Sequence, residues 1–125
     1  MHIKHTTKIK KKTLEDIHGA TTLYQVFWQA DSHGAKFGET KPESMKAFTN
    51  FARLTLKPGG TNKVHSHEDS EQVYIVLRGG GTVQVGEEKA EVEAGDAIFL
   101  PAKVQHGFFN TRKKIAVLLL IGTHV

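Results

Sequence analysis

The chain contains no cysteine, and this absence excludes several kinds of chemistry at once. Without cysteine there is no disulfide, no thiolate nucleophile and no cysteine-based zinc site, as is common in a reducing cytosol. Long apolar runs are absent too: the longest, residues 115–121, has seven residues, where a membrane-spanning helix needs about 20. The first residues also lack the apolar core of a signal peptide. We therefore expect a cytoplasmic protein with no membrane segment.

Proline is scarce, with three residues, whereas glycine is plentiful, with 12. The glycines lie at turns between short apolar runs, which is typical of an all-β chain. A chain of 125 residues has the usual size of one domain and can bury about two thirds of its unfolded surface. A long polar loop is expected at residues 30–46, and such loops often contact ligands. Strands are expected at residues 21–29, 48–56, 72–77, 82–85, 90–93, 97–100 and 115–121.

Positive charge is concentrated at the N-terminus. The net charge is +4, and the first twelve residues hold five lysines, so the rest of the chain sums to −1. No aromatic-rich or helical recognition element accompanies these lysines, so nucleic acid is not the favoured partner. We interpret residues 1–20 as a solvated basic arm and lead-in, followed by one β-barrel domain at residues 21–125.

Two histidines, His65 and His67, are separated by one residue and precede an apolar run. On a strand, alternate side chains share a face, so both imidazoles would point the same way. A catalytic metal site usually takes three protein ligands and leaves one position open. A pair alone is more often exposed to solvent, and a third ligand must come from elsewhere.

A second stretch, residues 95–110, supplies a third histidine and reads as a hairpin interrupted at Pro101. Together, the stretches at residues 59–79 and 95–110 resemble the two motifs of the cupin superfamily, G-X5-H-X-H-X3,4-E-X6-G and G-X5-P-X-G-X2-H-X3-N. The resemblance covers about residues 48–121 and implies a double-stranded β-helix, or jelly-roll barrel. One departure is Lys103, which stands where the second motif has a turn glycine. The matching positions are Gly59, His65, His67, Gly79, Gly95, Pro101, His106 and Asn110.

The acidic ligand of the first motif is replaced. Gln72 fits the motif spacing from both sides, whereas Glu71 fits only from His67. Strand alternation puts these two side chains on opposite faces. The resemblance therefore implies one divalent ion held by His65, His67, Gln72 and His106, with Glu71 as the less favoured substitute for Gln72. A purely structural role for Gln72, as a hydrogen-bonding residue of the barrel interior, is the alternative.

Three imidazoles and an amide carry no charge, so the ion would keep its full positive charge and favour anionic oxygen ligands. Cupins with this ligand set include the pectin-degradation type, which opens unsaturated uronates. Those proteins use charged residues late in the chain, where this sequence has the apolar residues 115–121, so that activity is not expected. We expect a metal-dependent enzyme of isomerase, lyase or dioxygenase type, using Fe, Mn, Zn or Ni, on a small oxygenated or carboxylated molecule. The alternative is a non-catalytic module that binds a sugar or an effector.

Further residues are weaker candidates. Tyr74, Phe99, Phe108 and Arg53 would contact a substrate if they face the barrel interior. Core packing is the favoured role for the aromatic residues other than Tyr74, and a solvated surface position is the default for Arg53. The histidines at positions 2, 5, 18, 33 and 124 lie in polar or terminal segments and are not expected to bind metal. Residues 115–121 do not alternate, so both faces of that strand should be covered, one by the core and the other by a second subunit or the N-terminal segment. A homodimer is expected.

Overall fold

The computed structural model describes residues 1–14, 16–30 and 45–125, and in these residues the regular structure is almost entirely β. The expectation of an all-β chain is confirmed. Most of the expected loop at residues 30–46 lies outside the described residues. No α-helix occurs in the described part of the chain, which has one short 3₁₀ turn, η1 (Thr6–Lys8). The strands are β1 (Thr22–Gln29), β2 (Phe48–Leu56), β3 (Thr61–His65), β4 (Ser70–Arg78), β5 (Gly80–Val85), β6 (Glu88–Glu93), β7 (Ala97–Leu100), β8 (His106–Phe109) and β9 (Ala116–His124).

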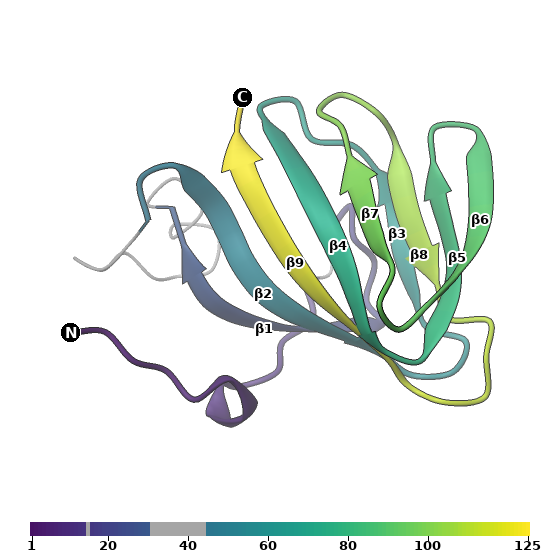
Figure 1. Ribbon diagram of the computed structural model, residues 1–125, viewed down its shortest axis with the longest axis horizontal. Coiled ribbons are helices and arrows are strands. Elements are labelled where there is room, and N and C mark those ends of the chain that lie inside the picture. Colours follow the sequence, from purple (N-terminus) through teal and green to yellow (C-terminus); the bar gives the residue numbers. More distant parts are fainter. Residues whose placement is uncertain (15, 31–44) are drawn as a thin grey trace.

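The strands form two antiparallel sheets (Figure 1). One has the order β1-β2-β9-β4-β7 and the other the order β3-β8-β5-β6. Both contribute side chains to one apolar core, with Leu54 and Leu118 from the first sheet and Val83 and Phe108 from the second. This core stabilises the pairing of the sheets because apolar area removed from water contributes about 25 cal/mol per Å².

Strand alternation decides which side chains face the interior. In β4, Gln72, Tyr74 and Val76 are buried, while the residues between them are partly exposed. In β9, alternate residues from Ala116 to Gly122 are buried, and Val117, Leu119 and Ile121 are half-buried on the outer face. The apolar run at residues 115–121 is therefore a strand with one buried face and one apolar outer face.

Most residues of the N-terminal segment are exposed, yet the segment is attached to the barrel by hydrogen bonds. Lys12 and Tyr24 exchange two backbone hydrogen bonds, of 2.9 and 2.6 Å. The amide of Gln25 donates to the carbonyl oxygens of Thr6 and Ile9. Since β1 is an edge strand, its backbone groups need partners, and the segment supplies some of them. The segment therefore lies along the sheet edge while most of its lysine side chains stay exposed.

Two turns depend on left-handed backbone conformations. Gly79, with φ of +70°, leads from β4 to β5, and a Cβ atom there would clash with the carbonyl oxygen of Ile115. Lys103 also has a positive φ, 66°, which is unfavourable for a residue with a side chain. Its N–H donates to the carbonyl oxygen of His67 at 2.8 Å. The backbone thus keeps the conformation of the motif glycine although the residue is lysine.

No helix in the described residues is long and apolar enough to cross a membrane.

Candidate metal centre

The sheet register brings His65 and His106 together. These residues are direct partners in the antiparallel pairing of β3 with β8, so their side chains leave the sheet on the same face. Their ring centroids are 4.5 Å apart, and both side chains are buried. The first and second motifs are therefore joined by ordinary strand pairing.

His67 lies just beyond the end of β3, in the connection to β4. Its ring centroid is 4.9 Å from that of His65 and 5.4 Å from that of His106. The hydrogen bond from Lys103 to its carbonyl ties this connection to the turn after β7. All three histidines that the motifs indicated therefore lie in one cluster.

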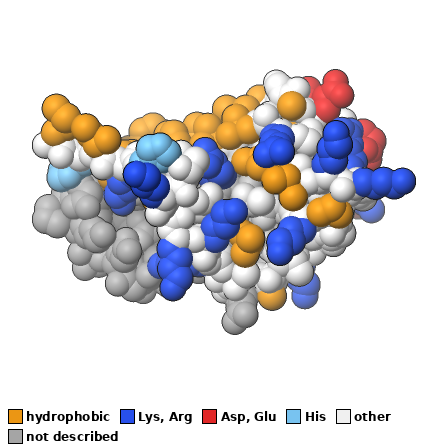
Figure 2. All heavy atoms as spheres, turned by 90° about the horizontal axis from the view of Figure 1, so that it is seen from below, with side chains coloured by type: hydrophobic (Ala, Val, Ile, Leu, Met, Phe, Trp, Pro, Cys, Tyr) orange, Lys and Arg blue, Asp and Glu red, His pale blue; other side chains and the backbone are white. Residues whose placement is uncertain are grey.

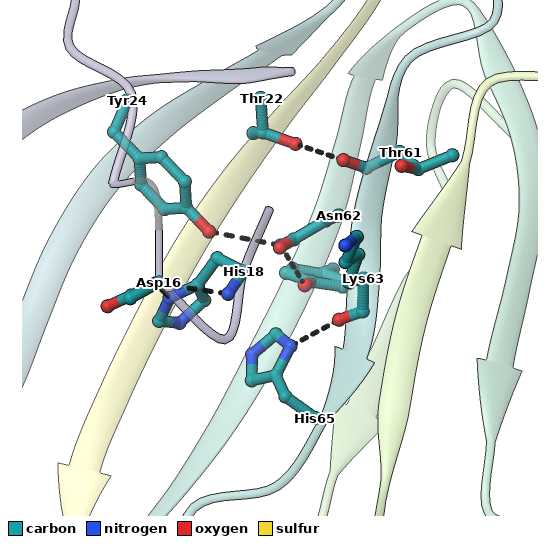
Figure 3. Close-up of polar contacts among 9 residues, drawn as sticks. Asp16, His18, Thr22, Tyr24, Thr61, Asn62, Lys63 and His65 are labelled. Atoms are coloured by element: carbon teal, nitrogen blue, oxygen red, sulfur yellow. Dashed lines mark hydrogen bonds and ion pairs between the residues drawn. The ribbon is translucent and has the colours of Figure 1, made fainter. Parts of the chain in front are cut away.

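A fourth histidine, His18, belongs to the same cluster and was not expected there. Its ring lies beside that of His65 (Figure 3), with the two centroids 4.2 Å apart. The centroid of the His67 ring is 5.6 Å away. One ring nitrogen from each of His18, His65 and His67 could reach a common ion, because these atoms lie within 4.8 Å of one another. The backbone places His18: its carbonyl oxygen accepts from the N–H of Lys63 at 3.0 Å. From its polar surroundings in the sequence, His18 was not expected to take part in a metal site. Its buried position beside His65 argues against that expectation.

Hydrogen bonds donated by Nδ1 orient two of these rings. Nδ1 of His65 lies 2.5 Å from the carbonyl oxygen of Lys63, and Nδ1 of His18 lies 2.5 Å from Oδ1 of Asp16 (Figure 3). A carbonyl oxygen only accepts, so His65 carries its proton on Nδ1 and leaves Nε2 as a lone-pair donor. A carboxylate has the same effect on His18. Metal-binding histidines usually have such a partner on the second nitrogen.

His106 differs from the others because no contact of its ring nitrogens reaches hydrogen-bonding geometry among the described residues, although the backbone of Val104 lies close enough to act on its pKa. Its side chain is 1% exposed. Burial, and then the nearby His65, lower its pKa to about 4. The ring is thus neutral at physiological pH and can donate a lone pair. Buried polar groups normally have a partner, and a bound metal ion would be a suitable partner for this ring.

His18, His65 and His67 line a narrow cavity of about 60 Å³, and His106 lies next to this group, with its ring centroid 4.5 Å from that of His65. A single water molecule needs roughly 10–15 Å³ of such space, so there is room for an ion and a few ligand atoms. Gln72 lies on the wall of this cavity, whereas Glu71 lies on the other face of β4. The structure therefore gives Gln72, not Glu71, access to the site. The described residues of the wall are Leu14, His18, Tyr24, Val26, Asn50, Ala52, Asn62, His65, His67, Gln72, Tyr74 and Leu120.

Two tyrosines and an asparagine form the polar floor of this cavity. The amide nitrogen of Asn62 donates to the hydroxyl oxygen of Tyr24 at 3.0 Å (Figure 3). It also donates to the hydroxyl oxygen of Tyr74 at 3.0 Å. Burial raises the pKa of Tyr74 well above its usual value, and burial followed by the proximity of Tyr74 does the same for the pKa of Tyr24. Both phenols stay protonated, and since each oxygen already accepts from Asn62, each O–H can donate to a ligand.

The other candidate substrate contacts are placed differently. Phe99 is 57% exposed on the outer side of β7, and Arg53 points outward from β2 between the inward residues Ala52 and Leu54. Neither lines the histidine cavity, because strand alternation turns both side chains away from it. Phe108 is fully buried in the core, with its ring centroid 6.3 Å from that of Tyr74. Of the four, only Tyr74 lines the cavity.

Residues 52–122 match the family model described as the cupin domain. An oxalate-binding protein of Thermotoga maritima is 31% identical over 75 residues, covering 57% of this chain and 62% of the relative. An uncharacterised protein of Methanocaldococcus jannaschii is 34% identical over 61 residues, which cover 49% of each chain. The chain thus spans about half to two thirds of the length of these curated relatives.

The fold is similar to that of solved cupin structures. A Thermotoga maritima protein described as a predicted oxalate decarboxylase superposes with a TM-score of 0.78 at 20% identity, covering 99% of this chain and 100% of the other. At this identity the likeness shows the fold alone. The expected double-stranded β-helix is confirmed.

Proposed function

Because the chain belongs to the cupin domain family, we propose that its histidine cluster holds one divalent metal ion and that the protein acts through this ion on a small carboxylated molecule. The observation that carries the proposal is His106, a buried neutral imidazole for which no hydrogen bond among the described residues reaches bonding geometry, although the backbone of Val104 lies close enough to raise its pKa slightly. It faces two further motif histidines, with ring centroids 4.5 and 5.4 Å away.

The residues that would hold the ion are His65, His67 and His106, with Gln72 or His18 completing the set. Imidazole and amide ligands suit Fe, Mn, Zn or Ni. All of these ligands are neutral, so the bound ion would supply an undiminished positive charge for polarising carboxylate oxygens. The carboxylate of Asp16 contacts His18 and would not bind the ion directly. It would therefore compensate the charge of the ion only indirectly. The donor set therefore favours an anionic ligand.

The cavity limits the size of that ligand. With about 60 Å³ available, a two-carbon dicarboxylate such as oxalate is better suited than a sugar. The name of the Thermotoga relative, an oxalate-binding protein, agrees with this size. The O–H groups of Tyr24 and Tyr74 would donate to the carboxylate oxygens, and their raised pKa values keep these donors protonated.

A second candidate function is binding without reaction. Among the described residues, the cavity wall contains no aspartate, glutamate, lysine or arginine that could act as a general acid or base. The tyrosines are poor bases because burial holds them in the neutral form. An effector-binding module would need only the metal and these donors.

Calorimetric titration of the metal-loaded protein with oxalate tests the proposal. We expect oxalate to bind to the metal-loaded protein and not to the metal-depleted protein, and we expect its neutral diamide, oxamide, to bind at least about tenfold more weakly. Gln72→Glu should weaken oxalate binding because it adds a negative charge at the cavity wall. Equal binding of oxalate with and without metal would refute the proposed role of the ion.

Reaction and simple binding are separated by following ¹³C-labelled oxalate with NMR. Decarboxylation cleaves the carbon–carbon bond of hydrogen oxalate and gives one formate and one carbon dioxide. Their appearance in the wild-type sample, and not in a His106→Ala sample, would identify a lyase. Binding without any labelled product would identify the binding module.

We also propose that a second copy of the chain covers part of the apolar outer face of the five-stranded sheet. Val73 pairs with Ile121 and Ile75 with Leu119 across β4 and β9, and all four side chains are half-buried on this face. Sedimentation of the wild type beside Ile121→Lys tests this, because a lysine there would oppose burial of the face.

A further inference from the structure

A second pocket, of about 430 Å³, lies outside the barrel, between the N-terminal segment and the outer face of the five-stranded sheet. It is separate from the histidine cavity because Arg53, on its wall, points away from the interior that Ala52 and Leu54 face. Its described lining residues are Thr7, Lys11, Gln25, Arg53, Thr55, Leu77, Arg78, Ile115 and Val117.

The charge of this pocket is unbalanced. Lys11, Arg53 and Arg78 are cationic, and no aspartate or glutamate occurs among the described lining residues. Three like charges around one hollow repel one another, and the repulsion is relieved only by an anion or by solvent. The pocket therefore favours a negatively charged occupant.

Arg53 is the most informative member of this group. One terminal nitrogen donates to the hydroxyl of Thr6 at 3.1 Å. Its Nε is buried and has no hydrogen-bond partner among the described residues. A buried guanidinium N–H without an acceptor is costly, since a charged group in the protein interior normally meets a carboxylate, a phosphate or a carbonyl. Arg53 thus lines a cationic pocket while one of its guanidinium N–H groups, the buried Nε, has no acceptor among the described residues.

The surroundings strengthen the positive potential. Figure 2 shows Lys and Arg side chains spread over this end of the molecule, while the acidic side chains in view gather at one edge. The loops that follow β2 and β8 contribute basic residues here, and the N-terminal segment adds its own. These residues include Lys10, Lys12, Lys57, Arg112, Lys113 and Lys114.

The remaining wall is partly apolar. Leu77, Ile115 and Val117 supply aliphatic surface, and Thr7 and Thr55 supply hydroxyl groups. From this combination we propose that the pocket binds a small oxyanion, a phosphate or a carboxylate, that carries an apolar group. The oxyanion is held by Arg53, Arg78 and Lys11, and the apolar group lies against Leu77, Ile115 and Val117. Guanidinium groups suit both kinds of oxyanion because their N–H groups match pairs of oxygen atoms.

The test is an NMR titration of the full chain at low salt with phenyl phosphate and, separately, with benzoate, reading the backbone amides and the Nε–H signal of Arg53. We expect at least one probe to shift the signals of Lys11, Arg53, Arg78 and Val117, and the affinities show whether phosphate or carboxylate is preferred. Arg53→Gln and Arg78→Gln should each weaken binding about tenfold. Arg78 is exposed at the end of β4, so its variant is expected to fold even if the Arg53 variant does not.

Lys113→Gln is the matched control, because it removes one positive charge from the same end of the molecule without touching the pocket. Binding to this variant should stay within about twofold of the wild type. The proposal fails if neither probe shifts these signals, or if Lys113→Gln weakens binding as much as Arg53→Gln. It also fails if the signals move with protein concentration instead of probe concentration, because a second copy would then fill the pocket.

Discussion

The histidine cluster joins two regions of the molecule that place their side chains by different means. His65 and His106 are held by a regular antiparallel register, in which the two residues are direct partners. His18, in the lead-in to β1, is held by one backbone hydrogen bond to Lys63 and by the Asp16 side chain. Paired strands alternate their side chains every second residue, and this period can be recognised in the sequence. A single hydrogen bond between distant segments produces no such sequence pattern.

The barrel therefore positions the central histidines of the cluster, and the lead-in adds His18 beside them. His65 is central, because its ring centroid is 4.2, 4.9 and 4.5 Å from those of His18, His67 and His106. Loss of a barrel histidine should therefore harm metal binding more than loss of His18.

The largest effect is expected from His65→Ala. Four-ligand zinc sites are worth roughly 10–16 kcal/mol, so losing the central ligand should weaken metal binding by about several hundredfold. Competition with a chromophoric chelator measures this change. His124→Ala, which removes an exposed histidine from the end of β9, should bind metal like the wild type. Similar losses in both variants would mean that metal binds to histidines generally and not to this cluster.

The next effect concerns the pH dependence of the metal-depleted barrel. The pKa of His106 is about 4 in the folded protein, below the value of about 6.5 for an unfolded histidine. Between these values the unfolded chain binds more protons, so the free energy of unfolding falls as the pH drops from 6.5 toward 4, by up to about 3 kcal/mol. Below pH 4 both states are protonated and this loss levels off.

Urea unfolding of metal-depleted protein at several pH values measures this loss. His106→Gln should lose clearly less stability between pH 6.5 and 5, a range above the usual titration of most carboxylates. Identical slopes for the two proteins would show that His106 is not held neutral by burial.

A smaller effect is expected from the lead-in. His18→Ala should weaken metal binding about tenfold, and Asp16→Asn should weaken it less, since Asp16 acts only through the orientation of the imidazole. Chelator competition measures both variants beside His65→Ala. If His18→Ala binds metal as tightly as the wild type, the lead-in packs on the cluster without joining it.

The smallest effect is expected from Lys103→Gly. A residue with a Cβ atom in the left-handed conformation is strained by about 1–2 kcal/mol, and glycine removes this strain. Glycine also raises the entropy of the unfolded chain, which offsets part of the gain, so we expect a net stabilisation of about 0.5–1 kcal/mol. Ala102→Gly, one residue earlier, should be destabilising, because its φ is not positive. Thermal unfolding compares the two. A loss of stability in Lys103→Gly would mean that the lysine side chain contributes more than the turn requires.

Much of the barrel could be predicted from the sequence, because its features repeat or have fixed spacing. The expected strands at residues 48–56 and 97–100 have the observed bounds, and alternation placed Gln72 and Tyr74 on the inner face. The meeting of His65, His67 and His106 followed from the motif spacing. Whether Gln72 binds the metal stays a prediction.

The remaining features depend on contacts between distant segments. Two contacts hold the N-terminal segment on the barrel: the hydrogen bond from Lys63 to His18 and the pairing of Lys12 with Tyr24. No local sequence pattern predicts either contact. The sequence contained one weak signal for His18, an aspartate two residues before it.

Phe99 and Arg53, which would contact a substrate only if they faced the interior, face outward for a simpler reason. The adjacent leucines, Leu100 in β7 and Leu54 in β2, occupy the inner face, and strand alternation then turns Phe99 and Arg53 outward. A single residue's chemistry does not fix its face, which depends on the pattern of the whole strand.

Elemental analysis of the purified chain after metal supplementation, beside His106→Ala, tests the proposed metal centre most directly. We predict close to one divalent ion per wild-type chain and only background metal in the variant, with both proteins folded by circular dichroism. Background metal in the wild type, or equal metal in the two proteins, would contradict this prediction.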